Sequence, residues 1–177
     1  WGGYWFWDPV ENASLMPWLS ATALIHCVVV LQRRNTMQSW TMVLAILTFS
    51  LSLAGTFLVR SGVLNSVHTF ASDPGRGLFI LIFLFIILSS SFLLFALKSE
   101  KINKPSSHNI SSRNTGIMVN NWLLISILSV VFLGTMYPLA TDLIYNQSLT
   151  VGPQYYAISI TPIIILFLFF MILSPQL

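Results

Sequence analysis

The sequence predicts an all-α integral membrane protein, a polytopic bundle of about five transmembrane helices. Hydrophobic residues make up 55% of its 177 residues and charged residues only 7%, whereas roughly 25% of a typical soluble domain is charged. The apolar residues form five runs, each close to the ~20 residues that cross a ~30 Å hydrocarbon core as a helix. Backbone groups in this core must form their hydrogen bonds internally, which favours helices over a β-sheet.

Loops of different charge join the predicted helices. The helices are expected at residues 13–32, 39–59, 77–97, 119–140 and 157–174, with outer loops at 60–76 and 141–156 and a basic inner loop at 98–118. Asn12 is predicted to cap the first helix, in which Pro17 is tolerated because it lies in the first turns. Asp73 and Pro74 predict the start of the third helix, as its cap and its first residue.

The basic residues orient these helices across the membrane. If successive helices alternate in direction, one side carries Arg60 and Arg76, and the other carries Arg33, Arg34, Lys98, Lys101, Lys104 and Arg113. The side rich in lysine and arginine is normally cytoplasmic, or faces the matrix in mitochondria. The first residues of the chain are therefore expected to face the periplasm or the intermembrane space.

The single cysteine, Cys27, restricts the chemistry of the chain itself. One cysteine excludes an internal disulfide, a CxxC redox pair and a thiolate metal cluster, so any thiol chemistry must come from a partner. The chain begins at Trp1 rather than methionine and shows no signal-peptide pattern. We expect it to be a fragment of a longer polypeptide.

The first eighteen residues carry the densest aromatic cluster. They contain four of the six tryptophans, and five of the first seven residues are aromatic: Trp1, Tyr4, Trp5, Phe6 and Trp7. An aromatic belt at the membrane surface is one interpretation. A platform for a large planar apolar ligand is the other, and it explains the density better. Asp8 and Glu11 give this surface an acidic edge, and we expect them to cap backbone amides next to Pro9 rather than to act as catalysts.

Two histidines are candidate ligands at different depths. His26 lies eight residues, or roughly 12 Å, beyond Trp18 and seven residues, or roughly 10 Å, before Arg33 at the helical rise. An ionisable residue at this depth indicates function, although a neutral histidine bonded to a neighbouring helix is the alternative. His68 lies in an outer loop on the side of the tryptophans, where a histidine is commonly just solvated.

Several segments of the chain resemble one family. The first twelve residues, WGGYWFWDPVEN, resemble the tryptophan-rich WWD motif of the haem-handling membrane proteins of cytochrome c biogenesis. GTFLVRSGVL at 55–64, SVHTF at 66–70 and DPGRG at 73–77 narrow the resemblance to the cytochrome c maturation protein F (CcmF-type) family. NNWLL at 120–124, LGTMYPL at 133–139 and VGPQY at 151–155 fit the same family. Tyr4 stands where the family often has tryptophan, but it still offers a ring face.

The resemblance implies two b-type haem sites, each only partly contained in this chain. His26 resembles an axial ligand of an intramembrane haem, and His68 resembles an axial ligand of a haem on the outer platform, with both partner ligands outside the fragment. Their different depths argue against one shared iron. The platform residues would be Trp1, Tyr4, Trp5, Trp7, Asp8 and Trp18. Arg60 would pair with a haem propionate, or would anchor the helix at lipid headgroups.

The implied activity is cytochrome c-type biogenesis. A member of this family would be the haem-binding component of a membrane haem lyase, which joins haem vinyl groups to the CxxCH thiols of apocytochrome c. Its expected partners are a haem chaperone, apocytochrome c, thioreductive and lyase-complex subunits, and quinol as the source of electrons that keep the haem reduced. No general acid, base or nucleophile is identified, and no nucleic acid is expected. The implied location is the inner membrane of a bacterium, with the mitochondrial inner membrane as the alternative.

Other functions are compatible with the same residues. A haem exporter and a fused cytochrome c synthetase share a similar tryptophan motif. A haem-free transporter or a structural subunit of a respiratory complex, with His26 as a proton relay, belongs to a different class. Haem absorbance separates the haem-free class from the haem-binding proteins.

Overall fold

The computed structural model describes residues 4–34, 36–62, 73–102, 113–146 and 149–173, and these residues form five α-helices without a strand. The helices are α1 (Pro9–Arg34), α2 (Gln38–Ser61), α3 (Pro74–Ile102), α4 (Arg113–Tyr145) and α5 (Pro153–Leu173). Each of the five contains a stretch long and apolar enough to cross a membrane. The prediction of an all-α, multi-spanning membrane fold is confirmed.

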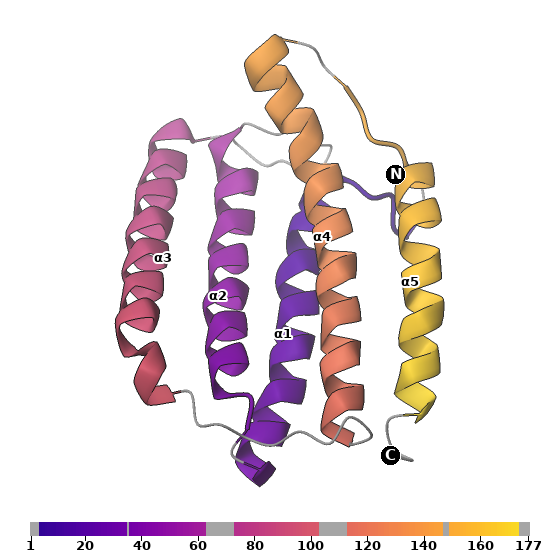
Figure 1. The fold of residues 1–177 in the computed structure, drawn as a ribbon. Helices are drawn as coiled ribbons and strands as arrows, with labels where there is room; N and C mark the ends of the chain where they lie inside the picture. Colours follow the sequence, from indigo (N-terminus) through magenta and orange to yellow (C-terminus); the bar gives the residue numbers. More distant parts are fainter. Residues whose placement is uncertain (1–3, 35, 63–72, 103–112, 147–148, 174–177) are drawn as a thin grey trace.

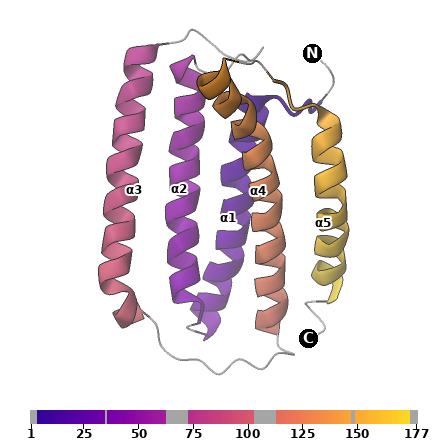
Figure 2. The ribbon, with the colours of Figure 1, turned by 45° about the horizontal axis from the view of Figure 1, so that its top comes forward.

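The five helices stand side by side in one row, in the order α3, α2, α1, α4, α5 (Figures 1 and 2). Successive helices run in opposite directions, so the start of α1, the end of α2 and the start of α5 share one end of the row. Among the described residues, α1 packs against α2 and α4, and the two outer helices each pack against one neighbour. The helix that carries the tryptophan motif is therefore the centre of the fold.

The helices extend beyond the apolar runs that predict them. Residues 98–102 and 113–118, which are expected in the inner loop, belong to α3 and α4, and α4 continues to Tyr145. Hydrophobicity marks only the part of a helix in hydrocarbon, and a helix can continue through the polar headgroup region. The first helix begins at Pro9, so the prediction that Asn12 caps it is wrong, because Asn12 already lies in the first turn.

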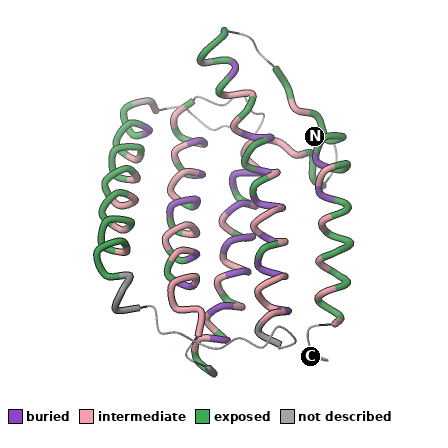
Figure 3. The backbone as a smooth tube through the Cα atoms, in the orientation of Figure 1, coloured by how far each residue is buried: buried purple, intermediate pink, exposed green. Residues whose placement is uncertain are grey.

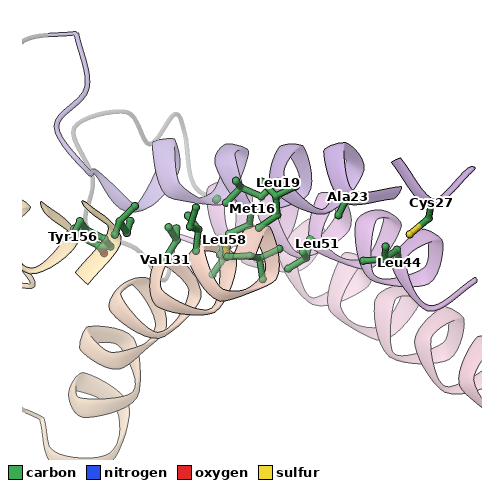
Figure 4. Packing of buried hydrophobic residues seen from close by; sticks show 14 residues of the cluster. Met16, Leu19, Ala23, Cys27, Leu44, Leu51, Leu58, Val131 and Tyr156 are labelled. Carbon is green, nitrogen blue, oxygen red and sulfur yellow. The ribbon is translucent and has the colours of Figure 1, made fainter. Parts of the chain in front are cut away.

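The core follows one stripe of α1. Its buried apolar residues recur at helical spacing: Ala13, Met16, Leu19, Ala23, Cys27 and Val30. Figure 4 shows four of them, Met16, Leu19, Ala23 and Cys27, beside core residues of α2 and α4. They meet Leu44, Leu51 and Leu58 of α2 and Leu124, Leu128 and Val131 of α4. Figure 3 shows that burial is concentrated on these three helices, whereas α3 and α5 are mostly exposed. Both outer helices therefore present wide apolar surfaces, as expected for contact with lipid or further protein.

Small residues let the helices approach closely at the end that carries the motif. A Cβ atom on Gly55 would lie 3.1 Å from the Ala13 carbonyl oxygen. A Cβ atom on Gly77 would lie 2.8 Å from the Cα atom of Ser61. Close backbone contact at glycine is typical of membrane helices, where packing rather than the hydrophobic effect drives association. The first contact lets α2 lie close to the start of α1, and the second lets the start of α3 lie close to the end of α2.

Candidate functional site

The predicted site residues are spread over two levels of the fold. Tyr4, Trp5, Trp7 and Asp8 precede α1, and Arg60 lies in the last turn of α2 at the same end of the row. Trp18 and His26 lie further along α1. Trp1 and His68 lie outside the described residues. Among the residues that the structure describes, no three histidine, cysteine or acidic side chains gather as a metal site.

Asp8 and Glu11 fold the segment that carries the aromatic residues. Asp8 Oδ2 accepts a hydrogen bond from the Val10 amide at 3.1 Å. Glu11 Oε2 accepts from the Phe6 amide at 2.9 Å and from the Asp8 amide at 3.1 Å. With Pro9 at the first helical position, Asp8 is the N-cap and Glu11 is the third helical residue, and we call this pair of acids the capping box. The prediction that these two acids cap amides next to Pro9 is confirmed, and both carboxylates are used in holding the turn.

Trp7 is packed into the fold rather than presented at the surface. Its backbone is left-handed, with φ of 59°, a conformation that bulky residues rarely adopt. Its ring stacks on the ring of Tyr156 with centroids 4.4 Å apart and planes 3° apart. The ring of Trp5 meets Trp7 edge-on at 6.1 Å. One face of the Trp7 ring is thus covered by Tyr156 of α5, so a ligand could contact only the uncovered part of the ring.

Asn12 ties the same segment to α5. Its side chain is fully buried, and Nδ2 donates to the Trp7 carbonyl oxygen and to the Tyr156 hydroxyl, each at 3.1 Å. Neither this role of Asn12 nor the part of Tyr156 is predicted from the sequence. The available signal is the Tyr155–Tyr156 pair in a segment expected near the outer end, but nothing in the sequence pairs it with Trp7.

Three rings of the described segment before α1 are exposed. Tyr4 is 101% exposed, Phe6 52% and Trp5 38%, and we call these three residues the outer aromatic surface. They lie just before the capping box, and in Figure 1 their segment runs from the start of α1 toward the start of α5. Such rings can cover a flat apolar ligand. Trp18 is also exposed, at 61%, but it lies about 15 Å further along α1 than Asp8 at the helical rise.

An open groove of about 450 Å³ lies between the first turns of α1 and the last turns of α2. It is lined by Val10, Ala13, Ser14, Pro17, Ser52, Gly55, Thr56, Val59 and Arg60. Arg60 is the one charged residue in this lining. Arg76 is paired with Asp73 at 3.1 Å, whereas the described part of the chain supplies no carboxylate partner for Arg60. The groove therefore combines an apolar floor with an available guanidinium, which suits an apolar ligand that has an anionic edge.

His26 occupies a different environment. It is half-buried on α1, and within the described ranges its imidazole makes no hydrogen bond. The neighbouring Cys27 is fully buried and accepts a hydrogen bond from Asn121 Nδ2 at 2.8 Å. His26 lies eighteen residues after Asp8, or about 27 Å along the helix. The structure does not bring His26 together with the outer aromatic surface, so any ligands at these places are separate.

The capping box gives a local prediction. Replacing Glu11 with alanine removes the acceptor of two amides, and we expect a loss of about 1 kcal/mol in the stability of this turn. Amide hydrogen exchange of residues 4–12, measured by mass spectrometry, should become about fivefold faster. Glu11→Gln retains a side-chain oxygen and serves as the control. Unchanged exchange in Glu11→Ala would contradict the capping role.

Known proteins share both sequence and fold with this chain. Residues 1–64, which contain the motif, α1 and α2, match the family described as "Cytochrome C assembly protein". The chain is 52% identical to the "Cytochrome c-type biogenesis protein CcmF" of Pseudomonas aeruginosa, over 92% of this chain and 25% of that protein. It is 48% identical to the "Cytochrome c-type biogenesis protein CycK" of Bradyrhizobium diazoefficiens, over 100% of this chain and 27% of that protein.

A less similar relative and a solved structure also belong to cytochrome c biogenesis by their names. Identity to the "Cytochrome c-type biogenesis protein NrfE" of Haemophilus influenzae is 40%, over 98% of this chain and 27% of that protein. The solved structure of "Cytochrome c Heme Lyase CcmF" matches with a TM-score of 0.74 and 29% identity, over 100% of this chain and 25% of that chain. The chain thus spans about a quarter of the length of these relatives.

Proposed function

Because this chain belongs to the CcmF-type family of cytochrome c-type biogenesis proteins, we propose that it is the haem-handling part of a membrane haem lyase. The observation that carries the proposal is the outer aromatic surface of Tyr4, Trp5 and Phe6, held by the capping box at one end of the row. These rings suit a flat apolar substrate such as haem. Attachment would join the haem vinyl groups to the CxxCH thiols of apocytochrome c.

The proposed orientation places the outer aromatic surface in the periplasm. Asp8, Glu11 and Asp73 lie at that end of the row, whereas Arg33 and Lys98 lie at the opposite end. Cytoplasmic ends of membrane helices carry the excess of lysine and arginine. A multi-spanning protein of the bacterial inner membrane, with its basic end in the cytoplasm, is therefore the arrangement that we favour.

At the outer site, this chain would bind and orient haem. The exposed rings would cover part of one face of the macrocycle, and Arg60 would pair with a propionate. His68 would supply one axial ligand, with the second from a part of the protein outside this chain. The reactivity of the vinyl groups toward thiols is a property of haem itself, so haem supplies the chemistry of thiol addition. Asp8 and Glu11 would hold the segment in shape and take no part in proton transfer.

A second haem is proposed at His26. The position is at membrane depth, and its imidazole has no hydrogen-bond partner among the described residues. An unpartnered ionisable side chain in hydrocarbon is costly, and coordination of a b-type haem would satisfy one of its nitrogens. The second axial ligand would come from beyond this chain. Such a haem could carry electrons, supplied by quinol, toward the outer haem.

Partners follow from the same chemistry. A haem chaperone would deliver haem to the outer site, and apocytochrome c would bring the thiols. Cys27 is buried between α1 and α4 and bonded to Asn121, so its thiol is unsuited to exchange with a substrate. Reduced thiols would therefore depend on thioreductive partners, and the remaining lyase subunits would complete the site.

The test is the visible spectrum of the full-length protein, purified in detergent, together with its reduced pyridine haemochrome. We expect a b-type haemochrome in the purified protein, and additional b-type haem when haem is supplied. A protein that contains no haem as purified and binds none on titration would contradict the proposal. That result would favour the haem-free transporter or structural subunit.

A further inference from the structure

The contact between Trp7 and Tyr156 joins two distant parts of the chain. Tyr156 lies in the first turn of α5 and is 144 residues from Asn12, to which its hydroxyl is bonded. It is only 2% exposed, although α5 as a whole is largely exposed (Figure 3). Figure 4 shows its side chain at the end of the core, next to the start of α1. The tyrosine is thus the point at which α5 holds the motif.

The hydroxyl of Tyr156 is hydrogen-bonded to the buried side chain of Asn12. It accepts from Asn12 Nδ2 at 3.1 Å, and the Thr135 side chain lies close to it. Thr135 Oγ1 donates its own hydrogen to the Val131 carbonyl oxygen at 2.7 Å. Asn12 Nδ2 links two acceptors from distant parts of the chain, the Trp7 carbonyl oxygen and the Tyr156 hydroxyl.

A glycine of α4 makes room for the tyrosine. A Cβ atom on Gly134 would lie 2.7 Å from the Tyr156 hydroxyl oxygen and 2.8 Å from ring carbons of both Tyr155 and Tyr156. These distances are too short for real contacts, so an added methyl group must displace the rings. Gly134 of α4 therefore supplies the space that the side chain of Tyr156 occupies.

The stack and the hydrogen bonds act on one strained residue. Trp7 has a left-handed backbone that is unfavourable for a bulky side chain. Tyr156 holds the ring of Trp7, while Asn12 holds both the Trp7 carbonyl oxygen and the Tyr156 hydroxyl. The ring of Trp7 in turn supports the exposed ring of Trp5 edge-on. A change at Tyr156 would therefore alter the direction in which the outer aromatic surface points.

We infer that Tyr156 is a positioning residue for the outer haem site: through Trp7 and Asn12 it fixes the arrangement of Tyr4, Trp5 and Phe6. The inference rests on the proposed function of that surface. In this arrangement Trp7 supports the outer aromatic surface, because one face of its ring stacks on Tyr156. Contact with haem is then made by the exposed rings. It also makes Gly134 a residue on which haem affinity depends although it belongs to another helix.

The test uses the full-length protein and measures haem affinity at the outer site by the change in Soret absorbance on titration. Loss of a buried aromatic pair corresponds to about a tenfold change in affinity, and we expect Tyr156→Leu to bind haem about tenfold more weakly. Tyr156→Phe retains the stack and should stay within about threefold of the parent. Tyr145→Leu, which changes an exposed tyrosine at the end of α4, is the matched control and should match the parent.

Haem retained at the His26 site reports whether each variant is folded. Gly134→Ala provides a second test, because alanine favours a helix over glycine and yet should weaken outer haem binding by displacing Tyr156. If Tyr156→Leu loses both haems, this variant is not folded, and the outer haem affinity of Gly134→Ala then tests the inference. Parental outer affinity in a folded Tyr156→Leu or Gly134→Ala variant would overturn the inference. A parent that binds no haem at the outer site would instead overturn the proposed function.

Discussion

Replacement of His26 with alanine in the full-length protein is expected to remove the intramembrane b-type haem. Replacing a residue that only hydrogen-bonds to a metal ligand already costs about 10–100-fold in metal affinity, so loss of an axial ligand should lower the haem content at least about tenfold. His26 is half-buried on α1 and far from the outer aromatic surface. The haem that is lost should therefore be the intramembrane one. The measurement is the pyridine haemochrome of the purified variant, expressed per protein.

Two further experiments separate coordination from folding at His26. Added imidazole should restore haem binding to His26→Ala, because it can enter the space left by the side chain and ligate the iron. His108→Ala is the control, since this third histidine of the chain lies in the predicted inner loop and is given no role. A His26→Ala protein with parental haem content would exclude this haem site and leave the histidine as a helix-packing or proton-carrying group.

Replacement of His68 with alanine should have the complementary effect. We expect the intramembrane haem to remain and the haem supplied by the chaperone to be lost, again by at least about tenfold. Cytochrome c maturation in cells that carry this variant should fall accordingly. The measurements are haem content after coexpression with the chaperone and the yield of holocytochrome c.

The comparison of the two variants tests whether two haem sites exist. Each variant should lose one population of haem and retain the other, and the double variant should lose both. If His68→Ala and His26→Ala removed the same haem, a single site would be indicated, contrary to the depth of His26 on α1. If His68→Ala kept full haem binding and full maturation, the outer ligand would have to be another residue.

Most of the fold follows from composition and periodicity. Apolar runs of the length that spans hydrocarbon identify five helices, because lipid selects side chains by hydrophobicity alone. The ends of these helices are less certain from the sequence. The Asp8-Pro9-Val10-Glu11 pattern is a capping box, but the apolar run begins later and favours Asn12 as the cap. The local pattern was the better guide to the start of α1.

The sequence by itself determined the membrane class, the helices, the capping role of Asp8 and Glu11, and the resemblance of the aromatic segment to a haem-handling motif. These properties depend on neighbouring residues or on the solvent around each helix, so a single sequence records them. Only the tertiary structure decided that α1 lies at the centre of the row, that Trp7 stacks on Tyr156, and that Asn12 is a buried link rather than a cap. Such contacts depend on the shapes of surfaces that meet from distant parts of the chain, and Gly134 reveals its role only when Tyr156 lies against it.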